Sequence, residues 1–129
     1  MNSSRNTTGL IVFAHGSSVE SANEAVRTAA AGLAERGGYA HVEAAFLEGG
    51  KPDLLGAGEA LLAKGAQRLV VLPYFLTVGL HLKRDLPKLI AEFREAHPEV
   101  AIETTPPLDG HAALVDILLT RAEEALQSR

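Results

Sequence analysis

The chain has 129 residues and a formal net charge of −4, with 47% hydrophobic and 22% charged residues. This length suits one domain with a buried core, and the composition is typical of globular rather than disordered proteins. The absence of Cys excludes disulfides, thiolate metal sites and Cys nucleophiles. The basic residues are scattered, which disfavours a nucleic-acid partner, because phosphate binding needs a basic stripe.

No stretch reaches the roughly 20 apolar residues of a membrane span. The first eight residues are polar and lack the apolar centre of a signal peptide. We therefore expect a cytoplasmic protein that contacts no membrane. Residues 1–8 are predicted to form a disordered or extended leader, and residues 9–129 a single domain.

Four apolar runs predict strands, and each is followed by a segment that predicts a helix. The expected strands are Gly9–Ala14, Tyr39–Leu47, Arg68–Phe75 and Val100–Thr104. The expected helices are Ser21–Arg36, Asp53–Lys64, His81–His97 and His111–Gln127. Ser17 or Ser18 is predicted to cap the first helix. Pro73 should end the regular pairing of its strand, and Pro87 should kink or restart its helix.

The alternation of strand and helix, four times at a spacing of about 30 residues, predicts a parallel sheet with right-handed crossovers. The expected fold is a three-layer α/β sandwich, in which helices flank a four-stranded sheet as in flavodoxin-like domains. In such sheets, ligands bind beyond the carboxyl ends of the strands.

Three histidines and one glutamate fall at this carboxyl edge. His15 follows the first strand, Glu48 the second, His81 the third and His111 the fourth. The other two histidines fall near the opposite edge: His41 and His97. Neutral imidazole suits Fe, Co, Ni and Zn ions, and a nearby carboxylate can be a further ligand or a proton acceptor. Two alternatives remain open, namely that Glu48 is a solvated loop carboxylate and that His111 caps its own helix.

The segment His15-Gly16-Ser17-Ser18 opens a helix, and helix N-termini can bind anions. However, the chain has no G-x-G-x-x-G, P-loop or G-x-S-x-G pattern, which disfavours a phosphate loop or a Ser nucleophile. Ser17 and Ser18 are interpreted as helix caps that could also donate hydrogen bonds to a substrate carboxylate.

The run Leu72–Leu82 is apolar and lies near the predicted functional edge. It is either simply core or an apolar wall for a flat ligand, as in many small-molecule pockets. The residues predicted to form this wall are Phe75, Leu76, Val78 and Leu80, and Gly79 beside them is a further predicted substrate contact.

Three segments together resemble a known family: residues 13–17 (FAHGS), 45–48 (AFLE) and 72–87 (LPYFLTVGLHLKRDLP). The third is the most specific, with an apolar strand, Pro, an apolar run, Gly-x-His and Asp-x-Pro. The family is that of the small single-domain sirohydrochlorin chelatases, class II chelatases of the cobalamin and siroheme pathways. The resemblance covers nearly the whole chain, from Gly9 to Leu126.

This resemblance implies a chelatase half-domain in which His15 and His81 bind the incoming metal ion, with Glu48 as an acidic partner. It also implies a homodimer, and no cofactor beyond the substrate metal. In some relatives an Arg follows His-Gly-Ser, whereas Ser18 stands here. Substrate carboxylates would then be paired by other basic residues: Lys51, Lys83 or Arg84.

The expected activity is insertion of a divalent ion into a sirohydrochlorin-type tetrapyrrole. Cobalt is favoured because the small family is associated with cobalamin synthesis, but Fe²⁺ and Ni²⁺ fit the same ligands. Two alternatives from other classes are a non-catalytic tetrapyrrole or metal carrier, and a flavodoxin-like regulatory domain with incidental histidines.

Overall fold

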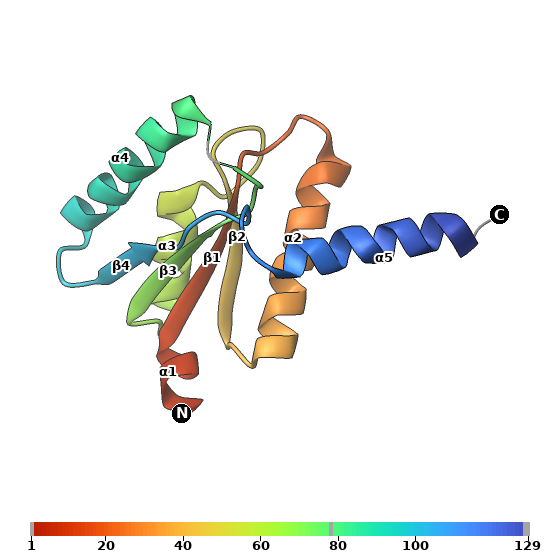
Figure 1. Ribbon diagram of the computed structural model, residues 1–129. Coiled ribbons are helices and arrows are strands. Elements are labelled where there is room, and N and C mark those ends of the chain that lie inside the picture. Colours follow the sequence, from red (N-terminus) through yellow and green to blue (C-terminus); the bar gives the residue numbers. More distant parts are fainter. Residues whose placement is uncertain (1, 78, 128–129) are drawn as a thin grey trace.

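The computed structural model describes residues 2–77 and 79–127, without the side chains of Asn2, Ser3 and His81. Four parallel strands form one sheet in the order β2-β1-β3-β4 (Figure 1). Their bounds are β1 Thr8–Ala14, β2 His41–Phe46, β3 Arg68–Pro73 and β4 Ala101–Thr104. The helices are α1 Asn2–Thr7, α2 Glu20–Gly37, α3 Leu54–Ala63, α4 Leu80–Ala96 and α5 Ala113–Gln127. The predicted parallel sheet flanked by helices is confirmed.

Strand β1 lies at the centre of the sheet between β2 and β3, and all seven of its residues are buried. Its continuous apolar sequence follows from this position, because a central parallel strand is covered on both faces. The strand therefore presents its carboxyl end, and the residue after it, to the middle of the functional edge.

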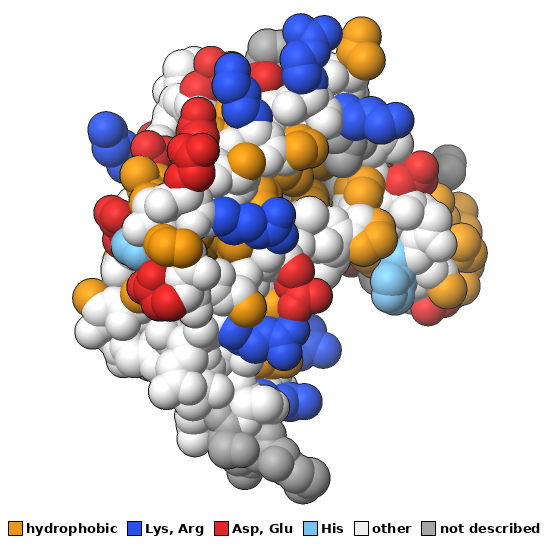
Figure 2. Space-filling model, turned by 90° about the vertical axis from the view of Figure 1, so that its left-hand side faces the viewer, with side chains coloured by type: hydrophobic (Ala, Val, Ile, Leu, Met, Phe, Trp, Pro, Cys, Tyr) orange, Lys and Arg blue, Asp and Glu red, His pale blue; other side chains and the backbone are white. Residues whose placement is uncertain are grey.

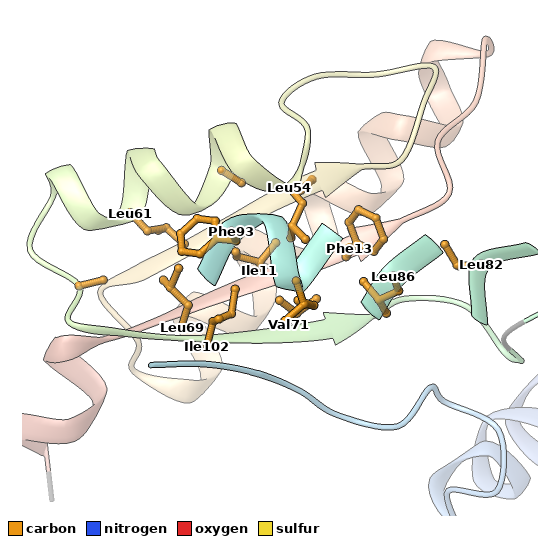
Figure 3. Close-up of a cluster of buried hydrophobic side chains, with 14 residues drawn as sticks. Ile11, Phe13, Leu54, Leu61, Leu69, Val71, Leu82, Leu86, Phe93 and Ile102 are labelled. Atoms are coloured by element: carbon orange, nitrogen blue, oxygen red, sulfur yellow. The ribbon is translucent and has the colours of Figure 1, made fainter. Parts of the chain in front are cut away.

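The sheet separates two hydrophobic clusters. The larger lies between the sheet and helices α3 and α4, and it includes Phe13, Leu61, Val71 and Phe93 (Figure 3). The smaller lies on the other face, where α2 packs on β1 and β2. This gives the predicted three layers: α2, the sheet, and α3 with α4.

The start of helix α2 differs from the prediction. The residue preceding α2 is Val19, which makes no side-chain cap, so the predicted Ser cap is wrong. Ser17 Oγ instead accepts the Val19 N–H over 3.0 Å, a local turn that competes with capping. Helix α3 does have a side-chain cap, because Asp53 Oδ1 accepts the Gly56 N–H over 2.8 Å.

The predicted effects of proline are partly confirmed. Strand β3 ends at Pro73, as expected for a residue without an N–H to donate. Helix α4, however, runs from Leu80 to Ala96 as one element with Pro87 inside it, so there is no restart. Leu82, Leu86 and Ile90 bury one side of this helix, and this packing offsets the cost of an interior proline.

The start of the chain also differs from the expected disordered or extended leader, because residues 2–7 form α1. Two residues of this segment hold it against the domain. The Arg5 guanidinium lies over the Tyr39 ring and hydrogen-bonds Gly37 O. Thr7 O accepts the Gln67 N–H beside the start of β3. Cation–π contact and hydrogen bonding thus order a polar sequence that has no apolar pattern.

Helix α5 projects away from the domain and has no buried residue (Figure 1). Within the described part of the chain, no helix is long and apolar enough to cross a membrane.

Candidate functional site

Two of the predicted residues meet where neighbouring strands β1 and β2 end. His15 is the first residue after β1, and Glu48 is the second residue after β2. His15 Nε2 lies 3.6 Å from Glu48 Oε2, and the side chains are 56% and 68% exposed. The sheet order explains this meeting, because β1 and β2 pair in parallel and their carboxyl ends share one edge. The pair is therefore open to a ligand from solvent.

Backbone hydrogen bonds continue past the paired residues of β1 and β2. They hold the backbone of His15 and Glu48 together. Leu47 N–H donates to Ala14 O, and Glu48 N–H donates to His15 O, each over 3.0 Å. Gly16 turns the chain away with a φ of 93°, and a Cβ there would lie only 1.6 Å from Glu48 O. Only glycine accommodates both the positive φ and the close approach of the Glu48 backbone.

Asn23, on the first turns of α2, joins the two loops and was not predicted from the sequence. It is 2% exposed. Its Oδ1 accepts the Ser17 N–H, while its Nδ2 donates to Ser17 O and Gly49 O over 2.8 Å each. One side chain thus binds the loop after His15 to the loop after Glu48. A polar residue in a helix usually faces solvent, so the residue type alone does not predict this role. The only sign in the sequence is the Gly49-Gly50 pair, which indicates a tight turn after Glu48.

The hydrogen-bonding geometry orients the imidazole. His15 Nδ1 lies 3.4 Å from Gly16 O, which can only accept, so a proton on Nδ1 suits this contact. With its proton on Nδ1, the ring leaves Nε2 free to bind a metal ion, 3.6 Å from Glu48 Oε2. An imidazole nitrogen and a carboxylate oxygen at this spacing can share a divalent cation. With zinc-like metal–ligand bonds of about 2.1 Å, the 3.6 Å separation corresponds to an angle of about 118° at the metal, wider than a tetrahedral angle.

The third predicted metal-handling residue, His81, falls in the first turn of α4, and its side chain lies outside the described part of the structure. Among the side chains that are described, no group of three His, Asp or Glu residues could hold a metal ion. The described donor set is therefore the His15–Glu48 pair. The predicted role of His81 stays a prediction.

The structure describes most, but not all, of the residues of the predicted apolar wall. Phe75 is half-buried and packs against the larger cluster, whereas Leu76 and Leu80 are 60% and 78% exposed. Gly79 directly precedes α4 and its carbonyl accepts the Lys83 N–H. Val78 lies outside the described residues. Phe75 thus packs on the core and stays partly exposed, while the two leucines present apolar surface near the functional edge.

A groove of about 490 Å³ lies beside this run, between α4 and the segment that follows β4. Its lining is mainly apolar and includes Leu82, Lys83, Leu86, Pro87, Ile90, Arg94, Thr104 and Pro107. Neither His15 nor Glu48 lines it. Figure 2 shows this side of the molecule, with basic side chains around exposed hydrophobic ones.

The loop after β4 is tied to the loop after β3. Leu108 N–H donates to Phe75 O, and Asp109 N–H donates to Leu76 O over 2.8 Å. His111 follows, and its Nδ1 accepts the Ala113 N–H over 3.0 Å at the start of α5. This contact favours the capping interpretation of His111, while its role toward a substrate stays a prediction. The exposed Ser18 likewise stays a predicted substrate contact.

An ion-pair cluster lies on the first turns of α2. The Arg27 guanidinium pairs with Glu20 and Glu24. Hydrogen bonding to Arg27 holds the pKa of Glu20 below its ordinary value. Arg27 also lies 5.4 Å from the centre of the Phe46 ring, at the end of β2.

The fold and the pair define a parallel α/β protein with a candidate divalent-metal site at the carboxyl edge of its sheet. The chain belongs to the CbiX family, whose family model matches residues 9–125.

Two curated relatives cover most of the chain. It is 31% identical over 118 residues to the chloroplastic sirohydrochlorin ferrochelatase of Arabidopsis thaliana, covering 92% of this chain but 52% of that protein. It is 32% identical over 118 residues to the sirohydrochlorin cobaltochelatase of Sulfolobus acidocaldarius, covering 92% of each. The chain thus spans about half of one relative and nearly all of the other.

Two solved structures differ in chain length in the same way as these two relatives. The CbiX protein of Marinobacter aquaeolei VT8 matches with a TM-score of 0.83 and 25% identity, over 95% of this chain and 99% of that one. The sirohydrochlorin chelatase SirB of Bacillus subtilis subspecies spizizenii, solved with cobalt, matches with a TM-score of 0.83 and 24% identity. That match covers 92% of this chain and 50% of SirB. The fold is therefore found both as a chain of this length and as half of a longer one.

Proposed function

We propose that this chain is a sirohydrochlorin chelatase, which inserts a divalent metal ion into a tetrapyrrole. The observation that carries this proposal is the exposed His15–Glu48 pair at the carboxyl edge of the sheet. Membership of the CbiX family and the activities of the two named relatives support it.

Each side chain of the pair has one role in the proposed reaction. The ring gives up two pyrrole N–H protons as the M²⁺ ion enters, so the net charge of the ring is unchanged. His15 Nε2 binds the incoming ion through its lone pair while water ligands leave. Glu48 accepts the two pyrrole protons one after the other and passes each to solvent. Its exposure suits this exchange, because a buried carboxylate would have no water to receive the proton.

His81 is proposed as a second metal ligand, placed by its Gly-x-His motif at the start of α4. Two imidazoles leave coordination positions open, and an ion held in this way can be passed on. A closed four-ligand site would instead be structural.

The remaining contacts with the substrate are proposed around this centre. Leu76 and Leu80 form an apolar surface for the macrocycle, together with the predicted Phe75, Val78 and Gly79. Ser17, Ser18 and His111 are proposed polar contacts, and Lys83 is proposed to pair a substrate carboxylate from the rim of the groove.

Cobalt is the ion we propose, with Fe²⁺ and Ni²⁺ as competitors, because imidazole and carboxylate bind all three. We further propose a homodimer, since the chain matches half of the longer SirB chain. No other cofactor is proposed, and the expected cytoplasmic location stays a prediction.

The test is an insertion assay with purified protein, sirohydrochlorin and Co²⁺, Fe²⁺ or Ni²⁺ in parallel, followed by the absorbance change of the ring. We expect many turnovers per protein molecule, fastest with Co²⁺. Binding of the macrocycle without turnover would show a carrier instead. No binding of the macrocycle would favour the regulatory-domain alternative and contradict the proposal.

A further inference from the structure

Tyr74 carries the most exposed aromatic ring of the chain, with 41% of the residue accessible. The chain has four Phe, two Tyr and no Trp, and the structure describes all six. Phe75 packs against the larger cluster, and Tyr39 lies under Arg5 just before β2. The other three are buried in the core: Phe13, Phe46 and Phe93. The aromatic ring most open to a ligand at the functional edge is therefore that of Tyr74 rather than the predicted Phe75.

The backbone places Tyr74 beside the end of β1. It is the first residue after β3, and its N–H donates to Phe13 O over 2.7 Å. This bond extends the β1–β3 register by one residue, so Tyr74 lies opposite Ala14. On the other side of β1, the Glu48 N–H donates to His15 O. Because β1 lies between β2 and β3, it ends between Glu48 and Tyr74.

The fold does not use the side chain of Tyr74 for any polar or ring contact. Within the described part of the chain, its hydroxyl makes no hydrogen bond, and its ring contacts no other ring or guanidinium. An aromatic side chain that is left open gains free energy when a ligand covers it, through loss of apolar surface and through ring stacking.

The surroundings of Tyr74 suit a flat apolar ligand. Outside α5, the exposed large hydrophobic side chains of the described residues all lie between the end of a strand and the first turn of the next helix. They come from all four strand ends: Val19, Leu55, Tyr74, Leu76, Leu80 and Leu108. The Leu108 N–H donates to Phe75 O, which holds the segment after β4 against the residue next to Tyr74.

We propose that the ring of Tyr74 stacks on the tetrapyrrole macrocycle and holds it over the end of β1, where His15 binds the ion. Two flat conjugated rings stack with an offset, and such a contact also fixes the tilt of the ligand. The hydroxyl of Tyr74 stays in solvent and takes no part in metal binding or proton transfer. This inference rests on the proposed chelatase function, because it names a contact with the substrate of that reaction.

Binding of sirohydrochlorin without metal, measured by equilibrium dialysis, tests the contact. Tyr74→Ala should raise the Kd of the macrocycle by roughly 10-fold or more, whereas Tyr74→Phe keeps the ring and should bind as the wild type does. Tyr39→Ala removes an aromatic ring at the opposite edge and should leave the Kd unchanged. Wild-type affinity in Tyr74→Ala, or equal loss in Tyr74→Phe, would overturn the proposal. So would a changed oligomeric state of Tyr74→Ala in sedimentation, which would assign the ring to a protein interface.

Tyrosine fluorescence gives a second measurement that needs only conservative variants. Because Trp is absent, Tyr39→Phe leaves Tyr74 as the sole emitter, and Tyr74→Phe leaves Tyr39. The seven residues of β1 span about 23 Å between the two edges, and energy transfer falls steeply with distance. We expect bound macrocycle to quench Tyr74 almost completely and Tyr39 clearly less, and equal quenching would overturn the contact.

The two proposals fail in different ways. A wild-type protein that binds the macrocycle through Tyr74 but inserts no metal would contradict the chelatase and leave the contact standing. Metal insertion by a Tyr74→Ala protein with wild-type Kd would contradict the contact and leave the chelatase standing. A wild type that binds no macrocycle would contradict both.

Discussion

Asn23 and Ser17 exchange two hydrogen bonds: the Ser17 N–H donates to Asn23 Oδ1 over 3.0 Å, and Asn23 Nδ2 donates to Ser17 O over 2.8 Å. The same Nδ2 donates to Gly49 O in the loop that follows Glu48. The spacing of His15 and Glu48 thus depends on a residue that touches neither side chain.

Asn23→Ala should therefore loosen the pair. Ser17 and Gly49 would lose their partners, so we expect the free energy of unfolding to fall by about 1–3 kcal/mol. The rate of metal insertion should fall by more than the loss of folded protein explains, because the two loops separate. Urea denaturation and the insertion assay measure the two effects. Glu24→Ala, on the exposed side of the same helix, is the control and should change stability by less than about 1 kcal/mol. Unchanged insertion in a folded Asn23→Ala protein would contradict this positioning role.

Gly16→Ala should disrupt the site, whereas Gly32→Ala should stabilise the protein. A Cβ on Gly16 would meet the Glu48 carbonyl, and its φ is positive. We expect a loss of more than about 1 kcal/mol, with loss of insertion activity. Gly32 lies inside α2 with nothing within 4 Å of an added Cβ, so alanine there should gain about 1 kcal/mol. Urea denaturation of both variants measures the change in the free energy of unfolding. Equal changes would contradict the close contact between Gly16 and the Glu48 backbone.

Glu48→Gln should slow insertion by about 10²-fold or more, because the amide cannot accept a proton as the carboxylate does. Glu59→Gln is the matched control. Glu59 also pairs with a histidine, His97 over 3.0 Å, at the opposite end of the sheet. We expect it to insert metal at the wild-type rate. If Glu48→Gln also retains that rate, Glu48 is not the proton acceptor.

Much of the fold could be predicted because the hydrophobic pattern of each segment matches its burial in the structure. The apolar run of β1 reflects burial on both faces, and strand–helix alternation implies the parallel sheet that brings His15 and Glu48 to one edge. Asn23 could not be predicted, because its partners are backbone groups on two other loops. The amphipathic sequence of α5 predicts an apolar partner surface, but no local pattern says whether that surface belongs to the same domain.

The most direct test of the account is metal insertion by the His15→Ala/His81→Ala double variant under multiple-turnover conditions, with His97→Ala as a histidine control at the opposite edge. Circular dichroism and urea denaturation establish that each protein is folded. We predict that the double variant inserts no Co²⁺ into sirohydrochlorin above the uncatalysed rate, while His97→Ala keeps its activity. Insertion by the folded double variant at the wild-type rate would contradict the assignment of these histidines.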